Sequence, residues 1–107
     1  MQAGYVADKS LGYAQSGVVD ASTLISSLTF GTGAVAGIPS GTHTILIQPQ
    51  AQAIRWRDDG GVPTAAVGYP VAVGAELRYT GSNFANLRVI GQAPNAIVNC
   101  VAYGSGV

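Results

Sequence analysis

Charged side chains are scarce in this sequence. Asp, Glu, Lys and Arg make up 9% of the 107 residues, against about 25% in a typical soluble domain. Five basic residues balance five acidic ones, so the formal net charge is zero. Binding to nucleic acid or to an anionic membrane would call for a basic patch, so the composition argues against both partners. Because 48% of the residues are hydrophobic, we expect some apolar surface to contact a protein partner.

Cysteine and histidine each occur once, as Cys100 and His43. One cysteine can form neither a disulfide within the chain nor a zinc site alone. A nucleophile needs a base beside it, and no local motif joins Cys100 to His43, although the fold could bring them together. Asp58 and Asp59 are adjacent, so they would point to opposite sides of a strand end and are poorly placed to act on one bond; capping a turn is the simpler role. We therefore predict a protein that is not an enzyme and uses no metal or cofactor.

Long hydrophobic runs are also missing. No apolar stretch approaches the roughly 20 residues that span a membrane. The first residues, MQAGY, have no basic segment followed by an apolar run, as a secretory signal would. The sequence therefore predicts synthesis in the cytoplasm without membrane insertion, and its length fits one domain.

What is present is a Gly-, Ala- and Ser-rich first part followed by short alternating segments. Residues 1–41 contain little patterned apolar surface, which predicts an extended N-terminal arm with irregular strands. Residues 42–107 predict a β-sandwich body, because short β-type runs alternate there with turn signals such as DGG at 59–61. The expected fold is all-β: a small antiparallel jelly-roll-like sandwich or barrel, forming one domain overall.

Alternation within these runs also predicts which side chains form the core. In the last run, 97–103, both faces are apolar, which is typical of a central or covered strand. The predicted core anchors are Ile45, Ile47, Trp56, Leu77, Tyr79, Val89, Ile97 and Val101.

The most distinctive segment is 55–64, which reads RWRDDGGVPT. It holds nearly half of the charged residues and the single tryptophan. We expect Trp56 to pack in the core, while Arg55 and Arg57 form bidentate pairs with carboxylates across the sheet. A second interpretation places the two arginines on the acidic surface of a partner, and the sequence does not choose between them.

The order of these motifs resembles a family of small virion proteins of tailed bacteriophages, the capsid cement or decoration proteins. The likeness covers about residues 42–103: RWRDDGGVPT, then GYPVAVG at 68–74, ELRY at 76–79, and strand-like runs at 86–90 and 96–103. It implies a jelly-roll-like domain on the capsid exterior of the virion, where it bridges subunits of the major capsid protein and stabilises the expanded head. It also implies self-association as a dimer or trimer at a capsid symmetry axis, and no catalytic residue.

Exposed aromatic and basic side chains are the candidates for capsid contact. They are Tyr5, Tyr13, Arg55, Arg57 and Tyr69.

Two other functions remain open at this point. One is a carbohydrate-binding β-sandwich of a phage head fibre or tail, with Tyr5, Tyr13, Tyr69, Tyr79 and Trp56 as faces for sugar stacking. The other is a small enzyme that uses His43 with Cys100 or Asp58.

Overall fold

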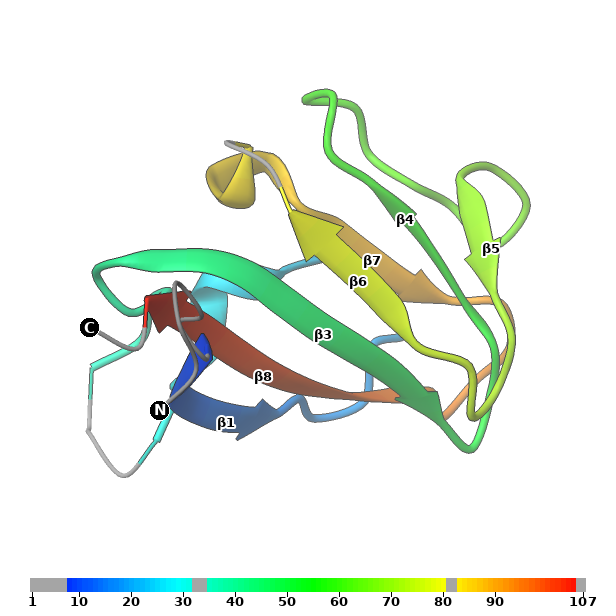
Figure 1. Ribbon diagram of the computed structural model, residues 1–107. Coiled ribbons are helices and arrows are strands. Elements are labelled where there is room, and N and C mark those ends of the chain that lie inside the picture. Colours follow the sequence, from blue (N-terminus) through cyan, green and yellow to red (C-terminus); the bar gives the residue numbers. More distant parts are fainter. Residues whose placement is uncertain (1–7, 32–34, 81–82, 106–107) are drawn as a thin grey trace.

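The chain folds as a sandwich of two four-stranded antiparallel sheets (Figure 1). The computed structural model describes residues 8–31, 35–80 and 83–105. One sheet has the strand order β1-β8-β3-β6 and the other β2-β7-β4-β5. The strands are β1 (Asp8–Gln15), β2 (Thr23–Leu24), β3 (Thr42–Gln50), β4 (Ile54–Arg57), β5 (Tyr69–Val71), β6 (Leu77–Thr80), β7 (Arg88–Gly91) and β8 (Ile97–Ser105). Two 3-10 turns, η1 (Ile25–Ser27) and η2 (Phe84–Asn86), complete the regular structure of the described residues.

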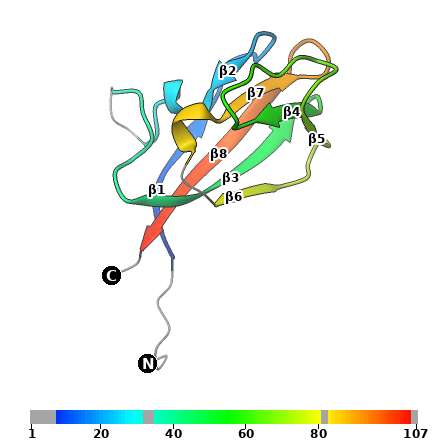
Figure 2. The ribbon, with the colours of Figure 1, turned by 90° about the horizontal axis from the view of Figure 1, so that it is seen from above.

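The pairing of the strands is that of a jelly roll. The first strand pairs with the last, the second with the seventh, the third with the sixth, and the fourth with the fifth, all antiparallel. The chain therefore crosses repeatedly between the two layers, which can be followed in Figure 2. Eight strands in two sheets with this nested pairing form a double Greek key, so the predicted jelly-roll-like sandwich is confirmed.

The core lies between the sheets and follows the alternation of the strands. On β3, Ile45 and Ile47 point inward and are fully buried, whereas Gln48 and Gln50 are exposed. This is the pattern expected when one face of an antiparallel strand meets the core and the other meets solvent. Of the predicted core anchors, four are buried and two are half-buried against the core; they are Ile45, Ile47, Tyr79 and Val89, and then Trp56 and Leu77.

The prediction was wrong for two residues of β8. Its inward side chains are Val98, Cys100 and Ala102, all fully buried. Ile97 and Val101 are half-buried and alternate with them, on the outer face of the sheet. β8 lies between β1 and β3, so both of its faces tolerate apolar side chains. Because a shift of one residue exchanges the two faces of a strand, alternation alone could not select the inner one.

The expected arm is also corrected. β1 pairs with β8 along its length, and Val19, Ile25 and Phe30 are buried in the core. Residues 8–31 therefore belong to the sandwich, although the arm was predicted to reach residue 41. The low hydrophobicity of this stretch has a structural cause, because small residues such as Ser16 fit against β8 and bond to it. The Ser16 Oγ accepts a 2.9 Å hydrogen bond from the backbone N–H of Val98. Residues 1–7, with Tyr5, lie outside the described residues.

The edge strands are short or irregular. β2 has two residues, and β5 contains Pro70, which offers no backbone donor. β1 is longer, but its register shifts between Ser10 and Gly12. Gly12 has a φ of 152°, and a Cβ there would lie 3.0 Å from the backbone nitrogen of Gly31. This irregularity therefore depends on glycine.

Candidate functional site

An aromatic cluster connects the two sheets next to the RWRDDGG segment. Trp56 on β4 lies opposite Tyr69 on β5, and their rings stack with centroids 5.4 Å apart and planes 29° apart. Trp56 also meets Tyr79 of β6 edge-on at 6.0 Å, and Tyr79 meets Phe84 in the same way at 5.5 Å. Offset stacking and edge-to-face contacts are the preferred geometries for such pairs. Trp56 therefore supports Tyr69, whose side chain is 69% exposed.

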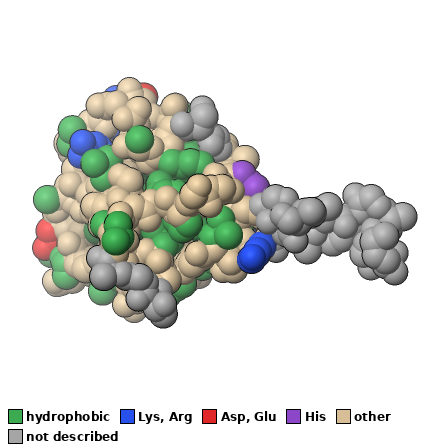
Figure 3. Space-filling model, turned by 90° about the vertical axis from the view of Figure 1, so that its left-hand side faces the viewer, with side chains coloured by type: hydrophobic (Ala, Val, Ile, Leu, Met, Phe, Trp, Pro, Cys, Tyr) green, Lys and Arg blue, Asp and Glu red, His purple; other side chains and the backbone are tan. Residues whose placement is uncertain are grey.

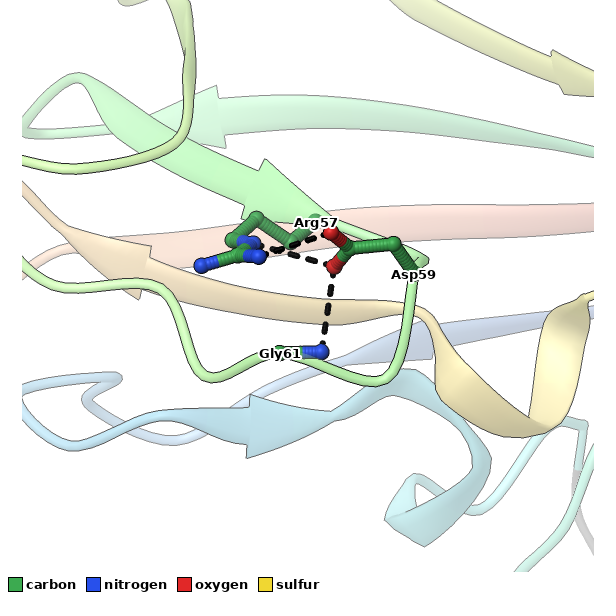
Figure 4. Close-up of polar contacts among 3 residues, drawn as sticks. All are labelled: Arg57, Asp59 and Gly61. Atoms are coloured by element: carbon green, nitrogen blue, oxygen red, sulfur yellow. Dashed lines mark hydrogen bonds and ion pairs between the residues drawn. The ribbon is translucent and has the colours of Figure 1, made fainter.

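The turn after β4 contains an ion pair (Figure 4). The Arg57 guanidinium donates two hydrogen bonds to the Asp59 carboxylate, at 3.0 Å from Nε and 2.7 Å from Nη2. The backbone N–H of Gly61 donates a third, at 3.0 Å. The hydrogen bonds from Arg57, followed by that from Gly61, lower the pKa of Asp59 to about 2. The bidentate geometry expected for Arg57 is confirmed, but its partner lies two residues along the same turn rather than across the sheet.

Arg55 has a different role from the one predicted. Its Nε donates to the carbonyl oxygen of Ala65 at 3.1 Å, and its Nη1 donates to that of Gly68 at 2.8 Å. Both carbonyls belong to the loop that joins β4 to β5. Arg55 therefore fixes this loop against the sheet, and the expectation that it faces a carboxylate is corrected.

These elements form a cleft of about 340 Å³. Asp58, on its wall, accepts a 2.7 Å hydrogen bond from the Tyr79 hydroxyl, which ties the cleft to the other sheet. Burial, together with this hydrogen bond, raises the pKa of Tyr79 to about 12. More than half of the side chain of Val62 and of Val67, from the same loop, is exposed. The lining residues of what we call the 57–69 cleft are Arg57, Asp58, Asp59, Val67, Gly68 and Tyr69.

A second hollow, of about 490 Å³, lies on the outer face of the β1-β8-β3-β6 sheet. The strand register places Gln15, Asn99 and Gln48 side by side on three adjacent strands. Asn99 is central: its Oδ1 accepts from the Tyr13 hydroxyl at 2.6 Å and from Gln15 Nε2 at 3.0 Å. Its Nδ2 donates to Gln50 Oε1 at 2.9 Å. We call this surface the amide groove.

Sequence reasoning missed the amide groove. The available signal was Gln48 and Gln50 alternating with buried residues on β3. Gln15 and Asn99 come beside them only through pairing of strands that are far apart in the sequence.

The predicted site residues fall in different places. Arg57 and Tyr69 meet at the 57–69 cleft, whereas Tyr13 lies in the amide groove and is 50% exposed. Tyr5 lies outside the described residues.

The candidate catalytic residues are not brought together. Cys100 is fully buried, and burial raises its pKa to about 12, which keeps the thiol protonated. The partner of Cys100 on β3 is Ile47, four residues from His43, and His43 is exposed. Asp58 is bonded instead to Tyr79.

Comparison with family models, with curated proteins and with solved structures found no match for this chain. Within residues 8–31, 35–80 and 83–105, no three His, Cys, Asp or Glu side chains are grouped as metal ligands would be. Neither of the two short helical turns in this part of the chain has the length or the apolar character to cross a bilayer.

Proposed function

We propose that this chain is a structural protein of a phage virion that binds the outer capsid surface and bridges subunits of the major capsid protein. The resemblance of residues 42–103 to capsid cement proteins motivates the proposal. A jelly roll is compatible with it, since this fold occurs in viral capsid and lectin domains, but a fold alone does not determine function. The structural observation that carries the proposal is the 57–69 cleft.

The cleft presents a rigid aromatic side chain to a partner. Tyr69 is 69% exposed, yet its ring is held by stacking on Trp56. A side chain that is already ordered loses little conformational entropy on binding, and buried tyrosines are frequent energetic centres of protein interfaces. Val67, 52% exposed, lines the cleft together with Tyr69 and adds to the apolar surface beside it. A partner that covers this area gains hydrophobic contact.

Two of the three charged residues of the cleft neutralise each other, and the third, Asp58, accepts a hydrogen bond from the Tyr79 hydroxyl. Arg57 and Asp59 satisfy each other in a bidentate pair, so a partner need not supply a counter-charge when it covers them. Removing an unpaired charge from water would cost far more. The surface is charge-poor more widely: Figure 3 shows a face on which hydrophobic side chains gather in the middle and the charged ones lie towards the rim. We therefore expect the docking partner to be an apolar projection of a capsid subunit.

Stabilisation of the head follows from selective binding. A protein that binds only the assembled, expanded shell shifts the equilibrium towards that shell by mass action. Bridging requires a second contact, for which we propose residues 1–7, attached to the start of β1. Self-association about a capsid two-fold or three-fold axis would close the contacts symmetrically.

Sedimentation with phage heads tests the proposal. Heads assembled without this protein are mixed with purified chain, pelleted, and the bound fraction is measured against concentration. We expect Val67→Asp and Tyr69→Ala to weaken binding about tenfold or more. Val18→Asp is the matched control, because Val18 is also 52% exposed but lies outside the cleft. Heads carrying the wild-type chain should also release DNA at a higher temperature than bare heads. Absence of the protein from purified virions, or equal binding by all variants, would refute the proposal.

A further inference from the structure

We propose that the amide groove binds a neutral oligosaccharide. The groove belongs to the β1-β8-β3-β6 sheet and shares no lining residue with the 57–69 cleft. The inference therefore does not depend on capsid docking, and the two surfaces could act in the same molecule.

The groove offers hydrogen-bond donors and acceptors in pairs, as sugar hydroxyls require. Among the described residues, the Oε1 atoms of Gln15 and Gln48 accept no hydrogen bond, and the Nε2 of Gln50 donates none. Each side-chain amide can donate through nitrogen and accept through oxygen, and each hydroxyl of a sugar does both. The bonds of Asn99 to Gln15 and Gln50 hold two of these side chains, and the bond of Gln48 to the Gly74 carbonyl oxygen holds the third, so little ordering is needed when a ligand binds.

Two tyrosines complete the recognition surface. Tyr13 lies opposite Val101, and Tyr103 lies two residues further along the same face of β8. The Tyr13 hydroxyl is fixed by Asn99 at 2.6 Å while half of its side chain stays exposed. The electron-rich face of an aromatic ring favours contact with weakly positive hydrogens, such as the axial C–H groups of a pyranose. The combination of ring faces and amides therefore matches the two chemistries of a sugar.

The charge of the groove argues for a neutral ligand. Among its described lining residues, Glu76 is the one with a formal charge, and it is exposed. Arg78 lies opposite the lining residue Leu46 in the strand register, so the formal charges of Glu76 and Arg78 cancel at this surface and give an acidic sugar or a phosphate no net attraction. The amide donors and acceptors of the groove can bind uncharged hydroxyl groups, for which no counter-charge is needed.

The size of the groove suits a ligand of more than one sugar ring. Its volume of about 490 Å³ falls within the range of roughly 300–1,000 Å³ usual for small-molecule sites. The row of Gln15, Asn99 and Gln48 spans three strands, which corresponds to about 10 Å across the sheet.

Binding of the isolated chain to an array of neutral and acidic oligosaccharides tests this inference. The neutral oligosaccharide that gives the strongest signal is then titrated by calorimetry. We expect Tyr13→Ala and Gln48→Ala to reduce its affinity about tenfold. Gln48 is exposed, and among the described residues its side chain makes one hydrogen bond, to the Gly74 carbonyl oxygen, so its truncation should leave the fold intact. Far-ultraviolet circular dichroism verifies this for both variants.

Tyr69→Ala is the matched control, since it removes a tyrosine of the other surface and should leave sugar binding unchanged. Three outcomes would overturn the inference: no neutral oligosaccharide is retained, acidic ones alone are retained, or Tyr69→Ala and Gln48→Ala reduce binding equally. None of these outcomes changes the binding of the chain to phage heads measured by sedimentation. Failure of one proposal is therefore distinguishable from failure of the other.

Discussion

Replacement of Trp56 by alanine tests the central role of the aromatic cluster. Truncating a fully buried tryptophan costs about 3–5 kcal/mol. Trp56 is half-buried, which reduces the burial contribution to about 2 kcal/mol. The ring pairs with Tyr69 and Tyr79 are worth about 0.5–1.5 kcal/mol each. We therefore expect Trp56→Ala to lower the free energy of unfolding by about 3 kcal/mol, a large share of the roughly 5–15 kcal/mol that stabilises a domain.

Urea and thermal denaturation followed by circular dichroism measure this loss. For a domain of about 100 residues, 1 kcal/mol corresponds to about 4 °C or more in Tm, so Tm should fall by at least about 12 °C. Tyr69→Ala serves for comparison. It removes an exposed ring that makes one stacking contact, with Trp56, so the free energy of unfolding should fall by about 1 kcal/mol. A Trp56→Ala protein as stable as the wild type, or a Tyr69→Ala protein equally destabilised, would refute the assignment of Trp56 as support and Tyr69 as contact residue.

Three further experiments test other features of the molecule. Cys100 should resist iodoacetamide at pH 8 in the native protein and react once urea unfolds it, because burial raises its folded pKa to about 12, above the ordinary thiol value. The contribution of this thiol to the free energy of unfolding should be complete below about pH 8.5 and decline as the pH rises towards 12, because the thiol ionises first in the unfolded chain. Arg57→Gln should raise the pKa of Asp59 from about 2 towards its ordinary value, as carboxyl NMR titration would show; the stabilisation by the wild-type pair should be present above about pH 4 and vanish as the pH falls through about 2. Gly91→Ala should destabilise the protein by about 1–3 kcal/mol, since its Cβ would lie 2.6 Å from that of Ala96, whereas Gly17→Ala, with nothing within 4 Å, should be nearly neutral in urea denaturation.

The strands of the second part of the chain could be predicted because their sequence alternates. Within the predicted body at 42–107, alternating segments became β3 (Thr42–Gln50), β4 (Ile54–Arg57) and β6 (Leu77–Thr80). Each has an apolar side that meets the core and turn residues at its ends, so local pattern and tertiary position agree.

β1 was missed because its sequence gives no such pattern. Its inward residue Ala14 is 3% exposed, and the next buried residue, Ser16, bonds to β8. Small side chains suffice where two backbones lie close together, and the partner strand is more than 80 residues away in the sequence. A local sequence pattern therefore could not predict this strand, because its partner lies far away in the sequence.

The candidate surfaces were predictable only in part. The segment 55–64 stood out by composition, and Arg57 and Tyr69 were proposed as contact residues. Their meeting in one cleft depends on the β4–β5 register, which places Trp56 opposite Tyr69. The amide groove gave no comparable signal, because Gln15, Gln48 and Asn99 are ordinary surface residues until strand pairing aligns them.

The irregular edge strands have a consequence for the behaviour of the protein at high concentration. A jelly roll has open sheet edges, and identical molecules crowded side by side could join them into continuous sheets and fibres. Charged edge residues are one protection, and this chain has Asp8 and Lys9 on β1 and Arg78 on β6. In addition, the register shift at Gly12 in β1 and the proline of β5 interrupt the backbone ladder. At β1 and β5, protection against polymerisation is thus built into the main chain.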